Sequence, residues 1–277
     1  MHRVVQIART FSTKPNKENF LTGIDGDYKK MTVFQKKQIS PDSYMLLLGY
    51  DKEKVLGVPV GRHMRIRFPE NHAEARTFTP LNNLEIPGSC ELLFKVYRPT
   101  PEFPNGGRMS QYLETLKPGD ILTVSGPRGK HEYLGNGEFL FHRLGKSMRF
   151  SRVSFVSGGT GLTPLYSILM NLKHTDPTKF TLLYANKTEA DILHRDKLED
   201  WKKSLKTDTF RVAYTVEYPS PSWKGYLGRV NKTMLQESLP PPSADHGVFV
   251  CGPEGMNESV REMLLGLGYG EDCVYVY

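Results

Sequence analysis

The sequence predicts two domains with different folds: an N-terminal antiparallel β-barrel, followed by an α/β domain built on a parallel sheet. Between residues 31 and 139, short runs rich in β-branched and aromatic residues alternate with Gly, Pro, Asp and Asn, a spacing typical of barrels and sandwiches. From Arg152 onward, candidate strands alternate with candidate helices, which indicates a parallel sheet wrapped by helices. A chain of 277 residues is also long enough to bury two cores.

Six strands and one helix are expected in the first domain. The expected strands are 31–39, 43–50, 63–68, 75–79, 90–97 and 120–125. The expected helix covers 110–116, because Gly106-Gly107 precede it, Pro118-Gly119 follow it, and Ser110 is a good N-cap residue.

The second domain is expected to contain five strands and four helices. The strands are 152–157, 180–185, 210–216, 247–251 and 273–277, and the helices are 163–173, 190–205, 232–237 and 255–267. Ligands of such sheets bind beyond the carboxyl ends of the strands. Residues 139–149 have a weak pattern and several basic side chains, so we interpret 140–150 as the connection between domains 31–139 and 151–277.

Composition is that of a globular protein, with 38% hydrophobic and 24% charged residues. The net charge of +7 fits either a generic basic surface or attraction of an acidic partner. Cys90, Cys251 and Cys273 are too few and too scattered for a disulfide framework or a zinc site, so a reducing compartment and no metal are expected. The sequence contains no run of about 18 apolar residues, so no transmembrane helix is expected.

The N-terminal arm, residues 1–30, begins with a basic segment. Residues 1–17 carry four Lys and Arg side chains with Ser and Thr, and contain no acid. This composition fits a mitochondrial presequence or, equally, a short basic disordered arm. A mitochondrial or cytoplasmic location is therefore expected.

One stretch joins strand, glycine turn and helix: Ser157-Gly158-Gly159-Thr160-Gly161-Leu162-Thr163-Pro164. The run 152–156 before it is typical of a buried strand, and Pro164 suits the first turn of the helix that follows. Glycines let the backbone approach a ligand, and the free N–H groups of a helix start attract phosphate. Taken alone, the stretch is as well explained by a tight turn with no ligand.

Three further motifs carry groups suited to cofactor binding. They are Arg76-Thr77-Phe78-Thr79-Pro80, Gly106-Gly107-Arg108-Met109-Ser110 and Cys251-Gly252-Pro253-Glu254-Gly255-Met256. The first offers a cation, a flat ring and a hydroxyl group, and the second offers backbone N–H groups beside a cation. The third is again a strand end, a glycine turn and a helix start. Each alone has an ordinary structural explanation.

In this order, the four motifs closely resemble the NADH-cytochrome b5 reductase family of flavoenzymes, which carries R-x-[YF]-T-P, G-G-[KR]-M-S, G-G-T-G-[IL]-T-P and C-G-P-x-x-M. The resemblance extends from about Met31 to Tyr277, and further segments such as Glu91–Tyr97 support it. It implies a barrel that binds FAD, an α/β domain that binds NADH, and a flavin at the cleft between them.

The resemblance also implies roles for single residues on the FAD side. Arg76 would bind the pyrophosphate, Phe78 would stack on the isoalloxazine and Thr79 would hydrogen-bond near its reactive N5. The remaining expected contacts to FAD are Thr77, Pro80, Lys95, Tyr97, Gly107, Arg108, Met109, Ser110 and Thr163.

On the NADH side, the resemblance implies phosphate binding by Gly158, Gly159, Thr160 and Gly161, with Pro164 opening the helix behind them. Ala185, Asn186 and Asp191 would line the adenosine. The nicotinamide would lie against Cys251, Gly252, Pro253 and Met256. Thr79 and Cys251 are thus the expected catalytic positions.

Several departures from the family pattern bear on chemistry. Phe78 replaces the usual tyrosine, which keeps stacking but loses the phenol. Glu217 replaces the usual aspartate beside the adenine ribose and disfavours a 2′-phosphate, whereas Arg229 stands at a position where it could attract one. Tyr277 replaces a terminal phenylalanine, where it would pack near the flavin or simply end the last strand.

The implied activity is hydride transfer from NADH to FAD, followed by single-electron transfer to cytochrome b5 or a similar acidic haem protein. Arg62, Arg65 and Arg67 are candidate docking residues, although a solvated strand face is the better explanation for any one of them. A flavin reductase that uses a quinone or ferric acceptor is the alternative, and a basic anion-binding module is a remote one. No nucleic-acid partner is expected, since the basic residues are dispersed, and a monomer is expected.

Overall fold

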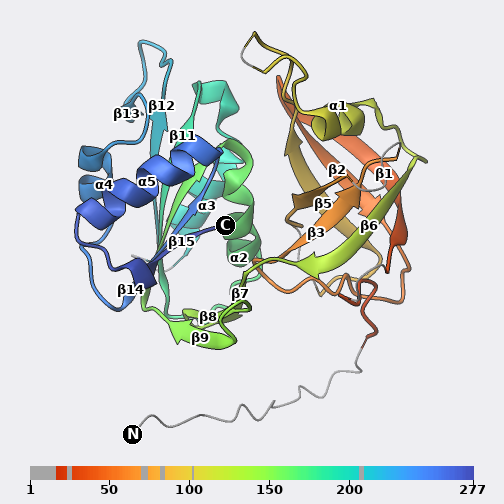
Figure 1. Ribbon diagram of the computed structural model, residues 1–277, viewed down its shortest axis with the longest axis horizontal. Coiled ribbons are helices and arrows are strands. Elements are labelled where there is room, and N and C mark those ends of the chain that lie inside the picture. Colours follow the sequence, from red (N-terminus) through yellow and green to blue (C-terminus); the bar gives the residue numbers. More distant parts are fainter. Residues whose placement is uncertain (1–16, 24–26, 70–73, 82–84, 102, 206–208) are drawn as a thin grey trace, which may run out of the picture.

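In the computed structural model, the two expected domains lie side by side (Figure 1). The structure describes residues 17–23, 27–69, 74–81, 85–101, 103–205 and 209–277. The basic segment 1–16 of the N-terminal arm lies outside these residues, and so does the prediction about a presequence.

The N-terminal domain is the expected antiparallel barrel. Its strands are β1 (Lys29–Ser40), β2 (Ser43–Gly49), β3 (His63–Arg67), β4 (Ala75–Phe78), β5 (Ser89–Lys95) and β6 (Ile121–Arg128). They are hydrogen-bonded in the order β4-β3-β6-β1-β2-β5. Just after β4, the Leu81 N–H donates to the Glu91 carbonyl at 3.0 Å, and Pro80 pairs with Leu92, so the two edge strands meet and close the barrel.

Helix α1 (Arg108–Thr115) covers one end of the barrel and buries Met109 and Leu113 in the barrel core (Figure 1). The prediction that Ser110 is the N-cap is wrong, because the helix begins earlier and Gly107 occupies that position. The Ser110 hydroxyl instead accepts from the Tyr97 N–H at 3.1 Å and donates to the Gly107 carbonyl at 2.8 Å. It therefore fastens the helix start to the chain leaving β5.

The end of the expected first domain and the expected connection 140–150 contain strands that the sequence pattern did not predict. β7 (His131–Gly135), β8 (Glu138–Phe141) and β9 (Lys146–Arg149) form a small antiparallel sheet. Their buried aromatic residues pack into the core of the second domain, whereas the exposed basic residues weaken any alternation in the sequence. The buried residues of this small sheet and its continuation are Tyr133, Phe139, Phe141 and Phe150.

The second domain is built on the expected parallel sheet. Its strands are β10 (Arg152–Gly158), β11 (Lys179–Asn186), β12 (Phe210–Val216), β13 (Tyr226–Leu227), β14 (His246–Cys251) and β15 (Val274–Val276). The order is β13-β12-β11-β10-β14-β15, with every pair parallel. The two-residue strand β13 was not predicted, since it is too short to show a periodicity.

Two helices cover each face of this sheet. α2 (Thr163–Met170) and α3 (Arg195–Ser204) pack with Phe155 in one core, and α4 (Lys232–Ser238) and α5 (Glu254–Gly266) pack with Val156 in the other. The prediction of one helix over 190–205 is wrong in its first part. A 3₁₀ turn, Glu189–Asp191, stands there, and His194, with φ of +54°, precedes α3. Helix α2 also ends at Met170, before the expected residue 173.

The order in which strands are added to the sheet reverses at β10, whose neighbours are β11 on one side and β14 on the other. The turns that follow β10 and β14 therefore lie side by side at the carboxyl edge, where parallel sheets bind ligands. Gly161 comes so close to the second turn that an added Cβ would lie 1.9 Å from the Cys251 carbonyl oxygen. Within the described residues, no helix is long and apolar enough to cross a membrane.

Candidate active site

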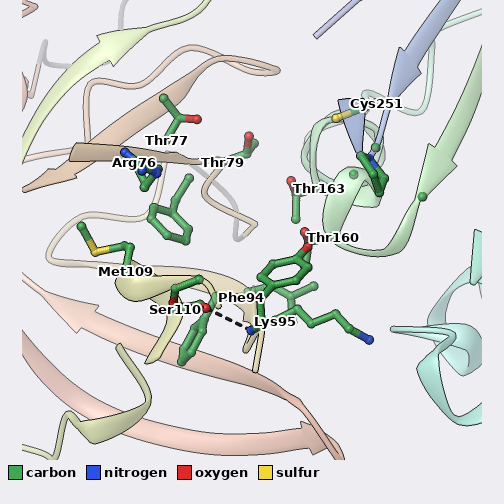
Figure 2. A pocket seen from close by; sticks show the side chains of 18 of the residues that line it. Arg76, Thr77, Thr79, Phe94, Lys95, Met109, Ser110, Thr160, Thr163 and Cys251 are labelled. Carbon is green, nitrogen blue, oxygen red and sulfur yellow. Dashed lines mark hydrogen bonds between the residues drawn. The ribbon is translucent and has the colours of Figure 1, made fainter. Parts of the chain in front are cut away.

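A cleft of about 720 Å³ between the two domains brings the four motifs together. The barrel contributes the end of β4 and the start of α1, and the second domain contributes the turns after β10 and β14. Figure 2 shows Arg76, Thr79 and Met109 on one wall and Thr160 and Cys251 on the other. Motifs as far apart in the sequence as Arg76 and Cys251 thus meet in one site.

The start of α1 forms an anion-binding corner on the barrel wall. The Gln111 N–H donates to the Gly107 carbonyl, so the N–H groups of Arg108, Met109 and Ser110 precede the first hydrogen bond within the helix. Gly106 adopts a φ of +57°, which turns the chain sharply into the helix. Unsatisfied N–H groups at a helix start are a suitable environment for phosphate oxygens.

Arg76 and Arg108 add two guanidinium groups to this corner, and one carboxylate joins them. Glu74 accepts from Arg76 Nη2 at 3.2 Å through one oxygen and from Arg108 Nη1 at 3.1 Å through the other. The arginine side chains are 59% and 53% exposed, whereas Glu74 is 16% exposed. Both cations therefore retain donors that face the cleft. Glu74 was not predicted as a site residue, because no local sequence pattern relates it to Arg108.

Phe78 and Thr79 follow each other where β4 ends at the cleft. Phe78 is half-buried and packs against the barrel core, and Thr79 is buried. The strand holds both backbones, so a flat ring and a hydroxyl group are presented from a rigid element.

The turn after β10 forms the wall of the second domain. Residues Gly159–Leu162 form a 3₁₀ turn that leads directly into α2, with Pro164 in its first turn as expected. Gly159 has a φ of +54°, and an added Cβ there would meet no atom within 4 Å. Its backbone is therefore open to a ligand. The Thr160 and Thr163 side chains lie on the cleft side of this turn (Figure 2).

Cys251, Gly252 and Pro253 complete that wall. Burial raises the pKa of the Cys251 thiol to about 12, so the thiol is neutral near pH 7 and is not a nucleophile. Met256 does not line the cleft but supports it: a Cβ on Gly158 would lie 2.6 Å from the Met256 sulfur. Cys251 thus shapes the wall, and Met256 packs behind the glycine turn.

Lys95 and Asp191 were expected to contact FAD and adenosine, respectively, and the structure joins them to each other. Lys95 lines the cleft, but its ammonium group lies 2.9 Å from Asp191 Oδ1 and 2.7 Å from Asp42 Oδ2. Asp191 is not among the residues that line the cleft, nor are Ala185 and Asn186, which lie at the carboxyl end of β11. Tyr97 lines the cleft and is exposed, as an FAD contact requires.

Two further residues of the cleft were not assigned to it by the sequence motifs. Tyr277 lines the cleft, and its ring lies 5.0 Å from that of His131, so it packs between the domains. His63 of β3 also lines the cleft, and burial with nearby cations lowers its pKa to about 4. His63 is therefore neutral near pH 7. Its position follows from barrel closure and not from any local motif.

Comparison with known proteins agrees with this geometry. A family model of the oxidoreductase FAD-binding domain matches residues 30–133, and one of the oxidoreductase NAD-binding domain matches residues 155–262. NADH-cytochrome b5 reductase 2 of Xenopus tropicalis is 36% identical over 269 residues, which cover 93% of this chain and 88% of that relative. The chain belongs to the NADH-cytochrome b5 reductase family.

The reductase family extends into larger enzymes. Nitrate reductase (NADH) 1 of Nicotiana tabacum is 36% identical over 254 residues, which cover 88% of this chain but 28% of that protein. The cytochrome b5 reductase domain of Ulva prolifera nitrate reductase superposes with a TM-score of 0.85 at 33% identity. That match covers 94% of this chain and all of that domain. This reductase fold therefore also occurs as one domain of a longer enzyme.

The residues of this reductase fit its two cofactors, FAD and NAD. On the barrel, two guanidinium groups and a helix start match a pyrophosphate, and a Cβ on Gly107 would lie 2.6 Å from Ser110 Oγ and fill the corner. On the second domain, an open glycine turn at a helix start matches a second set of phosphates. The cleft between them is where the flavin and the nicotinamide would meet.

Proposed function

We propose that this protein takes a hydride from NADH onto FAD and passes electrons singly to cytochrome b5 or a similar acidic haem protein. The observation that carries the proposal is the cleft, in which an anion-binding corner of the barrel faces an open glycine turn of the second domain. FAD, when bound, supplies the chemistry that links a two-electron donor to one-electron acceptors. The remaining task of the protein is to bind, orient and shield.

Each wall of the cleft has a distinct part in this proposal. Arg76, Arg108 and the start of α1 bind the FAD pyrophosphate, and Phe78 offers a flat face to the isoalloxazine. Thr79, on a rigid strand end, offers a hydrogen bond where negative charge develops on the flavin. The turn Gly158–Gly161 receives the phosphates of NADH.

Cys251 gives the nicotinamide a neutral, close-fitting wall, because its thiol stays protonated. Hydride transfer requires the reacting atoms to approach to about 3–3.5 Å, so the two phosphate sites must be held at a fixed separation. Buried leucines from both domains pack in one core beside the cleft and support that separation.

NADH is the proposed coenzyme, and two residues near the end of β12 support this choice. Glu217 repels a 2′-phosphate, and Arg229 Nε lies 3.4 Å from Glu217 Oε2. The carboxylate therefore engages Arg229, a cation that a 2′-phosphate would attract. Since Arg229 is 87% exposed, this pairing is weak and a mutation can release it.

The first experiment is a visible spectrum of the purified protein, followed by anaerobic addition of NADH or NADPH. We expect a flavin spectrum that NADH bleaches faster than NADPH. In the variant Glu217→Ala, the preference shifts toward NADPH by about tenfold or more, because a repulsive charge is lost and Arg229 is released. Arg229→Ala is the matched control, in which the rate of flavin reduction by NADPH should fall below that of the wild type. A protein that stays colourless with added FAD contradicts the proposal.

The electron acceptor needs its own test. The arginines in β3 and just before it support an acidic partner only in part. Arg67 stacks on the Tyr28 ring at 3.8 Å, and burial lowers the pKa of Arg62. Turnover with cytochrome b5 is therefore compared with turnover with quinones and ferric chelates. Fast quinone or ferric reduction without cytochrome b5 reduction favours the alternative reductase, whereas loss of cytochrome b5 turnover in high salt favours the acidic partner.

A mitochondrial location and a monomeric state complete the proposal. The basic composition of residues 1–17 supports the first. A fluorescent fusion of residues 1–30 tests targeting, and sedimentation of the full chain tests the oligomeric state.

A further inference from the structure

Lys95 lies at the boundary between the two domains and contacts a carboxylate from each. It is the last residue of β5, and its ammonium group lies 2.7 Å from Oδ2 of Asp42 in the barrel. The same group lies 2.9 Å from Oδ1 of Asp191 in the second domain. The Lys95 and Asp191 side chains are each 14% exposed, so solvent screens this pair less than an ordinary surface pair.

Asp191 is held rigidly on its own side of the boundary. Its second oxygen, Oδ2, accepts from the Thr188 N–H at 2.9 Å and from the Thr188 hydroxyl at 2.7 Å. These bonds cap the 3₁₀ turn Glu189–Asp191, which follows β11. Lys95 therefore pairs with a carboxylate that is fixed to an ordered turn at the carboxyl end of the parallel sheet.

Lys95 is held equally firmly on the barrel side. The Asp42 carboxylate accepts a hydrogen bond from the Ser43 hydroxyl at 3.1 Å, and the Asp42 backbone carbonyl accepts one from the Val96 N–H at 2.7 Å. Burial alone would lower the pKa of Lys95, but the hydrogen bonds and charges of Asp42 and Asp191 outweigh it and raise that pKa. The lysine is therefore charged over the whole physiological range.

Apolar packing continues the contact beside this ion pair. Leu93, two residues before Lys95, and Leu81 are buried in the same core as Leu162 and Leu165 of the second domain. Leu162 ends the glycine turn, and Leu165 belongs to α2. The apolar contact next to Lys95 thus includes the turn whose backbone would bind the NADH phosphates.

The ammonium group of Lys95 is poorly placed for a phosphate of FAD. Figure 2 shows its side chain extending away from Arg76, Met109 and Ser110, toward the second domain. Two carboxylates surround one ammonium group, so the local charge is negative and repels an anion.

We propose that Lys95 is a positioning residue: its ion pair with Asp191 joins the domains and sets the approach of the nicotinamide to the flavin. The Gly158–Gly161 turn moves with the sheet that carries Asp191, whereas Phe78 and Thr79 move with the barrel that carries Lys95. Loosening the pair leaves both cofactor sites intact but lets their separation vary. This inference rests on the proposed function.

The matched variants Asp191→Asn and Asp42→Asn test it, because each removes one charge from the same lysine. In Asp191→Asn the amide oxygen can still cap Thr188, and only the pair between domains is lost. Asp42→Asn weakens a pair within the barrel. Both holoproteins are mixed anaerobically with NADH, and the limiting rate of flavin reduction and the apparent Kd for NADH are measured. Bound FAD and the thermal midpoint are recorded as well.

We expect Asp191→Asn to lower the limiting reduction rate by about tenfold or more, with FAD content and thermal midpoint close to those of the wild type. Asp42→Asn should stay close to the wild-type rate, and Lys95→Arg should retain more of it than Lys95→Met. Equal rates in the two Asn variants overturn the inference. A raised Kd with an unchanged limiting rate also overturns it and favours adenosine binding by Asp191.

Loss of FAD from Lys95→Met would overturn the inference in favour of a direct FAD contact. The wild-type protein separates this test from that of the proposed function. A wild type that takes up no FAD, or is not reduced by NADH, overturns the proposed function and the inference together. If the wild type is reduced normally by NADH and Asp191→Asn is reduced at the same rate, only the inference is overturned and the proposed function stands.

Discussion

The Tyr133 hydroxyl donates a 2.5 Å hydrogen bond to Oδ2 of Asp176, which joins the small sheet between the domains to the loop before β11. The same carboxylate oxygen accepts from the Asn136 N–H at 2.7 Å, and Oδ1 accepts from the Thr178 N–H at 3.0 Å. Burial alone raises the pKa of Asp176, but these bonds outweigh it and lower that pKa. One buried carboxylate therefore organises the chain segment that leads from the first domain to the second.

Replacing Asp176 by alanine should destabilise the protein strongly, because several buried donors lose their acceptor together. We expect a loss of roughly 3 kcal/mol in the free energy of unfolding, measured with urea. Tyr133→Phe removes a single hydrogen bond from the same carboxylate and should cost about 1 kcal/mol. An Asp176→Ala variant no less stable than Tyr133→Phe would show that the carboxylate does not organise this segment.

The arginines of the anion-binding corner should matter for FAD affinity. Arg76→Ala removes one charge-assisted contact to the pyrophosphate, so we expect the Kd for FAD to rise by about tenfold or more, as measured by flavin fluorescence. Arg98→Ala is a matched control, because Arg98 is also exposed and also pairs with a carboxylate, Glu114, but does not line the cleft. Similar losses in both variants would contradict a local role for Arg76.

The close approach of the two turns of the second domain predicts a steric effect at Gly161. A Cβ there would lie 1.9 Å from the Cys251 carbonyl oxygen, a backbone atom that cannot move without displacing the turn. Gly161→Ala should therefore lower stability by roughly 1–3 kcal/mol and slow flavin reduction by NADH. Gly255→Ala is the control, since a Cβ at that position meets no atom within 4 Å. A Gly161→Ala variant as stable and as active as Gly255→Ala would contradict the packing.

Local sequence patterns predicted most of the helices and strands, and the elements that they predicted wrongly have a physical explanation. Buried runs such as 152–157 and 180–185 predicted β10 and β11 because a strand covered on both faces is continuously apolar. The expected helix 190–205 failed in its first part because the chain leaves helical geometry after the 3₁₀ turn: Ile192 is extended, and His194 has a φ of +54°. Sequence periodicity does not register such a break, because it follows the spacing of apolar residues and not the backbone dihedral angles.

The candidate site divides in the same way. The motifs predicted which backbone turns reach the cleft, since glycine positions and helix starts are local features. Pairings such as Glu74 with Arg108, or Lys95 with Asp191 at a separation of 96 residues, depend on how distant elements pack. No single-sequence pattern contains them. These pairings are nevertheless what orients the charged groups and holds the domains together.

The buried histidine His131 predicts how stability depends on pH. Its ring lies against those of Phe141, Phe249, Tyr275 and Tyr277, and burial, with Lys130 and His142 nearby, lowers its pKa from 6.5 to about 4. The unfolded chain therefore takes up this proton first as the pH falls. Stability is lost between about pH 6.5 and pH 4, by at most roughly 3 kcal/mol from this residue.

His131→Phe should flatten this part of the stability curve, because an apolar ring replaces a group that must stay neutral. Urea unfolding at pH 7 and at pH 4.5 measures the difference for each protein. Some acid sensitivity should remain, since burial also lowers the pKa of His63 and of His246 to about 4. The exposed His174 provides the control His174→Gln, which should keep the wild-type pH dependence. If His131→Phe loses as much stability on acidification as the wild type does, His131 is not a source of the acid sensitivity.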